Sequence, residues 1–121
     1  MIGWDRILYG ASLSAVFAVG GLAALGTRRV AVLVTAGMSA LLAPIGWNAV
    51  LRATHAGEFF TDAPVAVFPI SWQDTGSGVV TVALASVLLG FGPLGSAPAR
   101  SAVLVALGAG LAALFVDVYL Y

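Results

Sequence analysis

Several polar side chains that could do chemistry lie within or beside long apolar segments of this sequence. Asp117 lies near the end of the last apolar segment, Asn48 and Arg52 near the end of the second, and Arg6 just before the first. Ionisable residues inside membrane-spanning helices are rare, face the protein interior and are usually paired. We therefore expect an intramembrane polar cluster in which Asp117 pairs with Arg52 or Arg6, beside Asn48. This cluster would either hold the helices together or take part in the binding or transfer of a proton or cation.

A second group of candidate residues comprises His55, Glu58 and Asp62, at spacings of three and four residues. If this stretch were helical, those spacings would place the three side chains on one face. An imidazole with two carboxylates could bind a metal ion or act in acid–base catalysis. One His and two carboxylates match no zinc signature, however, and Gly57 lowers the helix propensity. The alternative is a solvated loop whose polar residues face water.

Several function classes are excluded by residues that the sequence lacks. It contains no Cys, which removes disulfides, thiolate catalysis and iron–sulfur ligation. Five basic and five acidic residues balance to a net charge of zero, so no field attracts nucleic acid. Neither a phosphate-binding P-loop, nor a GxGxxG turn, nor a nucleophile elbow is present. We predict no cofactor and no catalytic residue.

The elements that position these side chains are long apolar segments. The composition is 61% hydrophobic and only 8% charged, whereas about a quarter of the residues of a soluble domain are charged. A bilayer core of about 30 Å requires a helix of roughly 20 apolar residues. The whole chain is thus expected to form one all-α transmembrane domain. Four segments of suitable length predict its helices, at about 7–26, 30–51, 78–95 and 101–120.

The connections between these segments predict two helical hairpins in a four-helix bundle. The first and third connections are short and carry Arg28, Arg29 and Arg100, whereas the second is a long loop at about 52–77. Three Arg against two favour the cytoplasm for the short connections. Both termini and the long loop are then extracytoplasmic, in a multi-pass protein of the cell membrane. The middle of the loop is apolar but too short to span a bilayer, so it should fold over one face of the bundle.

Small residues at every fourth position predict how the helices pack, because small side chains let helices approach closely in lipid. Pro44 should kink the second helix, since proline removes a backbone donor and presses on the preceding turn. The expected packing faces are Gly10, Ser14 and Ala18 on the first helix; Ala31, Thr35, Ser39 and Ala43 on the second; and Ala102, Ala106 and Gly110 on the fourth.

Together these features favour a non-enzymatic polytopic membrane protein that acts as a homo-oligomer or as a subunit of a larger membrane complex. Its partners would be membrane lipid and either further copies or another membrane subunit. A channel or transporter for a proton, cation or small solute, using Asp117 and Asn48, is the first alternative. The second alternative is a membrane enzyme or metal protein using His55, Glu58 and Asp62.

Overall fold

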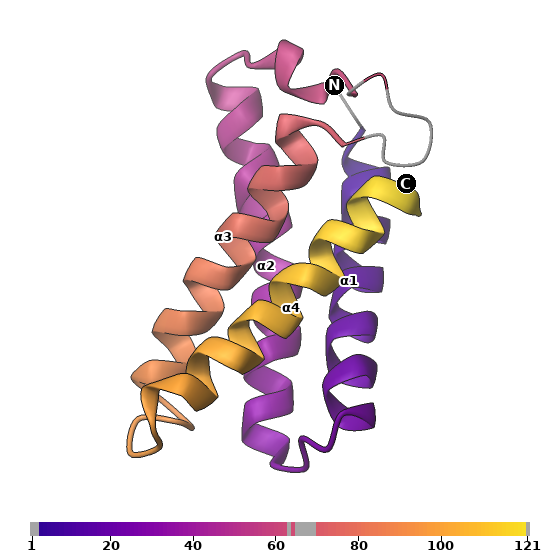
Figure 1. The fold of residues 1–121 in the computed structure, drawn as a ribbon. Helices are drawn as coiled ribbons and strands as arrows, with labels where there is room; N and C mark the ends of the chain where they lie inside the picture. The colour runs from indigo at the N-terminus through magenta and orange to yellow at the C-terminus, as the bar shows by residue number, and fades with distance from the viewer. Residues whose placement is uncertain (1–2, 63, 65–69, 121) are drawn as a thin grey trace.

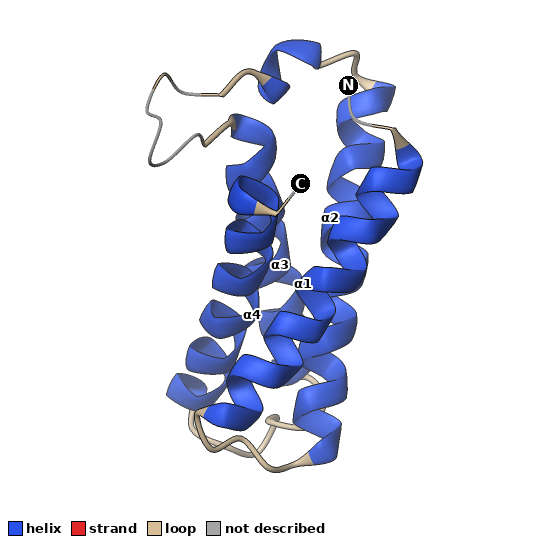
Figure 2. Ribbon diagram, turned by 90° about the vertical axis from the view of Figure 1, so that its right-hand side faces the viewer, coloured by secondary structure: helices blue, strands red, loops and turns tan. Residues whose placement is uncertain are grey.

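Four α-helices dominate the computed structural model, which describes residues 3–62, 64 and 70–120 (Figure 1). They are α1 (Trp4–Ala24), α2 (Val30–Ala53), α3 (Trp72–Gly90) and α4 (Ala99–Tyr119). A single turn of 3-10 helix, η1 (Gly57–Phe60), follows α2. The described residues contain no strand, which confirms the predicted all-α class (Figure 2).

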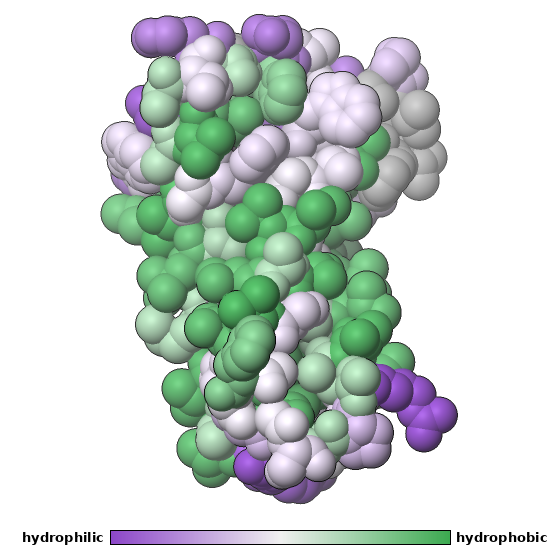
Figure 3. Space-filling model, turned by 90° about the vertical axis from the view of Figure 1, so that its left-hand side faces the viewer, coloured by the Kyte–Doolittle hydropathy of each residue, from purple (hydrophilic) through white to green (hydrophobic). Residues whose placement is uncertain are grey.

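Three of these helices are long and apolar enough to cross a membrane, namely α1, α2 and α4, when the described residues are searched. Large hydrophobic side chains such as Leu8, Val16 and Leu111 lie exposed on the outside of the helices. Figure 3 shows a broad hydrophobic middle, with hydrophilic surface gathered toward the two ends of the molecule. In water such a surface would cost free energy, so the structure supports the predicted membrane class.

The helices pack side by side, with α1 against α2 and α4, and α3 against α2 and α4. Consecutive helices run in opposite directions (Figure 1). The start of α1, the end of α4 and the described parts of the connection from α2 to α3 therefore lie at one end, here called the long-loop end. The α1–α2 and α3–α4 connections lie at the opposite end, here called the short-loop end.

Helix α3 begins at Trp72, upstream of the start expected near Gly78. Its first turn is fixed by a capping box, in which Ser71 Oγ accepts from the Asp74 amide at 3.2 Å. In return, Asp74 Oδ2 accepts from the Ser71 amide at 2.9 Å. These bonds satisfy two backbone donors that a helix start leaves open, so the polar residues before Gly78 become helical.

Small residues fill the interior, but the buried faces match the expectation only in part. The faces through Gly10, Ser14 and Ala18, and through Ala102, Ala106 and Gly110, are buried as predicted. On α2, Ser39 and Ala43 are buried, whereas Ala31 is exposed and Thr35 only half-buried. The buried face of α2 instead runs through Val32, Ala36 and Ala40.

Helices α3 and α4 approach closely where two glycines, Gly78 and Gly110, face each other. A Cβ atom at Gly110 would lie 3.0 Å from the Gly78 carbonyl oxygen and would overlap a methyl group of Val82. A Cβ atom at Gly78 would lie 3.4 Å from the Gly110 carbonyl oxygen. The missing side chain at Gly110 thus permits this close approach of the two backbones, and Gly78 leaves room for Leu114, whose Cβ atom would lie 3.3 Å from a Cβ atom at that position.

Candidate functional site

Three buried polar side chains from three helices meet near the long-loop end. Gln73 Nε2 of α3 donates to Asn48 Oδ1 of α2 at 3.4 Å and to Asp117 Oδ2 of α4 at 3.3 Å. Asn48, Gln73 and Asp117 are 0%, 2% and 4% exposed. Because buried polar groups are costly without partners, this contact stabilises the junction of the three helices.

The position of Asn48 is fixed by its own helix. Its Nδ2 atom donates to the Pro44 carbonyl oxygen at 2.8 Å, which leaves its Oδ1 atom for Gln73. Pro44 is buried inside α2, and the helix continues through it. Since proline has no N–H, the carbonyl of Ala40 lacks its usual helical donor at this point. The kink expected at Pro44 stays a prediction.

Gln73 is the member of this site that sequence reasoning missed, because the apolar segment starts only at Gly78. The residue was therefore assigned to the loop. The Ser71-x-x-Asp74 pattern of a capping box could have moved the helix start upstream. With that start, Gln73, Ser77 and Thr81 fall on one helical face, and all three are buried.

Trp47 of α2 packs beside the site and contacts both α3 and η1. Its Nε1 atom donates to the Gln73 carbonyl oxygen at 3.0 Å, and its ring centroid lies 6.3 Å from that of Phe59 in η1. A Cβ atom at Gly76 would overlap the Trp47 indole. Gly76 thus makes room for the indole, which joins α2, α3 and η1.

The two arginines predicted for the polar cluster differ in their surroundings. Arg52 is half-buried, and its guanidinium carbon lies 4.9 Å from the centroid of the Trp4 ring, a cation–π contact between α2 and α1. Arg6 is exposed. Pairing of Asp117 with either arginine stays a prediction. The Gln73 amide, which was not predicted for this cluster, contacts both Asp117 and Asn48.

No single helix places His55, Glu58 and Asp62, the predicted loop cluster, on one face. All three side chains are exposed, and α2 ends before them at Ala53. Within the described part of the chain, no three His, Asp or Glu side chains lie close enough to hold a metal ion. The metal hypothesis therefore gains no geometric support here.

His55 has a structural role at the end of α2. Its φ angle is 55°, in the left-handed region. The Ala56 amide donates to the Leu51 carbonyl oxygen at 3.0 Å, and the His55 amide donates to that of Arg52 at 3.3 Å. This pair of bonds is the Schellman motif that closes many helices, and histidine is among the residues enriched in the left-handed region.

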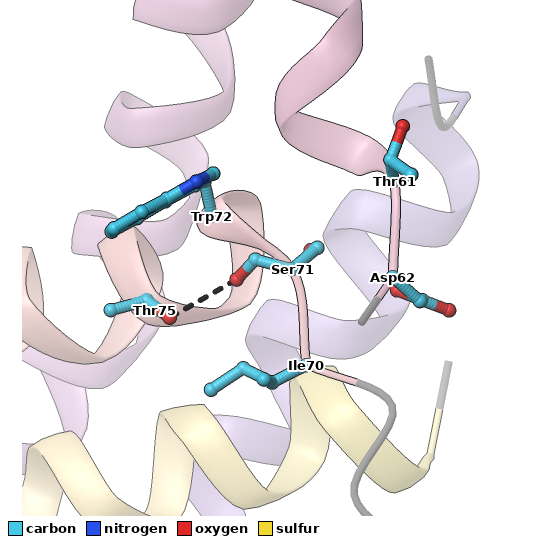
Figure 4. A pocket seen from close by; sticks show the side chains of 6 residues that line it. All are labelled: Thr61, Asp62, Ile70, Ser71, Trp72 and Thr75. Carbon is cyan, nitrogen blue, oxygen red and sulfur yellow. Dashed lines mark hydrogen bonds between the residues drawn. The ribbon is translucent and has the colours of Figure 1, made fainter. Parts of the chain in front are cut away.

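A pocket of about 340 Å³ lies at the start of α3, lined by residues from both ends of the long loop. Figure 4 shows Thr61 and Asp62 on one segment and Ile70, Ser71, Trp72 and Thr75 on the other. The Thr75 hydroxyl donates to the Ser71 carbonyl oxygen. Asp74 lies in the turn beside this pocket, before the apolar part of α3. Burial raises the pKa of Asp74 to about 6, bonds from Ser71 oppose this rise, and the charge of Asp62 adds to it.

Comparison with models of protein families, with curated proteins and with solved structures found no match to this chain. The proposals below therefore rest on the residues and on their arrangement in the structure.

Proposed function

We propose that the chain is an integral membrane protein with four spans, in which α3 is the fourth. Helix α3 packs between α2 and α4, both of which are apolar enough to cross a membrane. Its polar first turn would lie in the headgroup layer, and its apolar part from Gly78 to Gly90 is continued by the turn at Phe91–Leu94. A span this short is accommodated by local thinning of the bilayer. The result is two hairpins in one four-helix bundle.

The charges favour one orientation of this bundle in the cell membrane. Arg28, Arg29 and Arg100 belong to the short-loop end, and all five acidic residues belong to the long-loop end. The positive-inside rule then places the short connections in the cytoplasm. Both termini and the long loop would be extracytoplasmic.

Within the membrane, we propose that the protein acts without catalysis of its own, as a homo-oligomer or as a subunit of a larger membrane complex. The observation that carries this proposal is a small-residue stripe on α2 that faces away from the other helices. Gly46, Ala49 and Ala53 are all exposed. In lipid, such stripes favour helix association because they allow close backbone contact.

Native mass spectrometry of protein released from nanodiscs tests this proposal. Apart from the adjacent residues and backbone of its own helix, no described atom lies within 4 Å of a Cβ atom at Gly46 or at Gly20. Gly46→Leu should therefore leave the chain's own packing intact but block association through α2. Gly20→Leu, an equally open position on α1, is the matched control and should leave the assembly unchanged.

A defined oligomer, or a co-purifying membrane subunit, that is lost only in Gly46→Leu would support the proposal. A wild-type monomer without any partner would refute it. Equal assembly of both variants with the wild type would show that α2 is not the associating face.

A second candidate function is handling of a proton or cation at the long-loop end. It is favoured by the burial of Asp117 beside the carbonyl-bearing side chains of Asn48 and Gln73, since intramembrane acids often mark ion pathways. Asp117→Asn keeps the shape of the side chain but removes its charge. Proton or cation flux into liposomes that falls in Asp117→Asn would support this function, and unchanged flux would contradict it.

A further inference from the structure

An apolar groove of about 300 Å³ runs between α1 and α4, the two outermost helices of the chain in sequence. Both helices are apolar enough to cross a membrane, and in a bilayer this groove would face the lipid hydrocarbon. Its lining includes Phe17, Gly21 and Leu22 of α1, Leu25 directly after that helix, and Gly108 and Phe115 of α4.

The groove owes its depth to two glycines. Apart from the adjacent residues and backbone of α1 itself, no described atom lies within 4 Å of a Cβ atom at Gly21, so this position faces open space. Gly108 on the facing helix leaves room for Leu22, because a Cβ atom there would lie 2.9 Å from Leu22 Cδ2. The Leu22 side chain can therefore pack close to α4, and the groove remains open beside it.

The two ends of the groove differ. At one end Phe17 and Phe115 meet edge to face, with ring centroids 6.0 Å apart. At the other end the groove reaches Leu25, which follows the last residue of α1 and is 86% exposed. The groove thus has an aromatic end inside the membrane and an end beside the short connection of α1 to α2.

Positive charge gathers at this second end. The Arg28 guanidinium donates to the Ala23 carbonyl oxygen, which holds it against the final turn of α1, in the same turn as Leu22 and Leu25. Arg29 is exposed beside it. No Asp or Glu occurs between residues 7 and 57 or between 75 and 116, so the short connections carry positive charge without negative charge.

We propose that the groove binds an acyl chain of an anionic phospholipid whose phosphate lies against Arg28. The chain of the lipid would occupy the space beside Gly21 and end near Phe17 and Phe115. A zwitterionic lipid fits the apolar groove equally well but gains less from the uncompensated arginine. One arginine near an anionic headgroup gives a preference of about fivefold.

Competition between two lipids in native mass spectrometry tests this site. The protein is released from nanodiscs that contain equal amounts of phosphatidylglycerol and phosphatidylcholine with identical acyl chains, and the retained lipid is counted per chain. Wild-type protein should retain phosphatidylglycerol about fivefold over phosphatidylcholine. Arg28→Gln should bring the two lipids close to equal retention.

Filling the groove provides the second comparison. Gly21→Leu should remove most retained lipid of both kinds, whereas Gly20→Leu, the adjacent open glycine outside the groove lining, should retain lipid as the wild type does. The proposal is overturned if wild type retains both lipids equally, if Arg28→Gln keeps the preference, or if the two leucine variants behave alike.

A measurement on the wild type keeps the test valid if Gly21→Leu fails to fold. Phosphatidylglycerol with a photoactivatable group in its acyl chain should cross-link to the segments 17–25 of α1 and 108–115 of α4. Labelling spread evenly over all helices would overturn the site. Because oligomer masses appear in the same spectra, loss of lipid with the assembly intact separates this proposal from the one for α2.

Discussion

Gln73 and Asp117 are joined side chain to side chain, although 44 residues separate them in the sequence. The nitrogen of the same amide also reaches Asn48 of α2. An amide nitrogen carries two hydrogens, so it can donate one to each acceptor. Gln73 is therefore the one residue of this junction that bridges the other two, and its removal affects both partners at once.

Replacing Gln73 by Leu should destabilise the protein by about 1–2 kcal/mol. Leu keeps much of the volume but leaves Asn48 Oδ1 and Asp117 Oδ2 without this donor. The free energy of unfolding, measured in mixed micelles with increasing denaturing detergent, checks the effect. Ser12→Ala is the control, because the exposed Ser12 hydroxyl donates within its own turn of α1, to the Leu8 carbonyl oxygen. A Gln73→Leu variant as stable as Ser12→Ala would contradict a stabilising role for the junction.

Much of the helical architecture could be predicted because a bilayer demands long apolar segments, and α1, α2 and α4 satisfy that demand directly. The start of α3 could not be found in this way. Its first turn is polar, so hydrophobicity does not mark it as helical. The capping box at Ser71 and Asp74 makes this turn helical instead. Asn48 and Asp117 were expected at the site because they lie within long apolar segments. Gln73 was not expected there because it precedes the apolar part of α3.

The rotation of each helix about its axis was harder to predict. On α2 apolar residues lie on every side, so hydrophobicity does not separate the face toward lipid from the face toward protein. The small-residue pattern favoured Ala31, yet Val32 is buried and Ala31 is exposed. Arg6 was assigned to the polar cluster from its depth and its side of the membrane. These do not set the direction of a side chain, so its pairing with Asp117 stays a prediction.

Gly76→Ala should destabilise the protein by about 1–3 kcal/mol, because the added methyl group overlaps the Trp47 indole. The ring would have to move and give up its hydrogen bond to the Gln73 carbonyl oxygen. A red shift of tryptophan fluorescence should accompany the loss of stability.

Gly90→Ala is the matched control for this substitution. It lies at the end of the same helix, and a Cβ atom there meets no described atom within 4 Å apart from the adjacent residues and backbone of α3 itself. This variant should be neutral or slightly more stable, since alanine favours helix over glycine by up to about 1 kcal/mol. Equal stability of the two variants would show that the indole does not need the space at Gly76.

His55→Gly should retain or increase stability, by up to about 1 kcal/mol, because glycine adopts the left-handed conformation without cost. His55→Val should destabilise, since a β-branched residue is strained at this φ angle. Thermal unfolding checks both variants, and elemental analysis of the purified proteins checks for metal. Loss of a bound metal in both variants, with equal loss of stability, would instead restore the metal hypothesis for this loop.

Asp74 should make the stability of the protein depend on pH. Its folded pKa of about 6 lies above the ordinary value of 3.8, so the folded state binds the proton more tightly than the unfolded state does. The stabilising effect of protonation is complete below about pH 4 and is lost as the pH rises toward and through 6. The full change is on the order of 2–3 kcal/mol.

The free energy of unfolding measured between pH 4 and pH 7 checks this dependence. Asp74→Asn keeps an oxygen that can accept from the Ser71 amide but does not titrate, so its stability should be nearly constant over this range. Glu58→Gln, which removes an exposed carboxylate, should keep the slope of the wild type. If Asp74→Asn retained that slope, another group would be responsible, and burial of Asp74 would not control the stability of the start of α3.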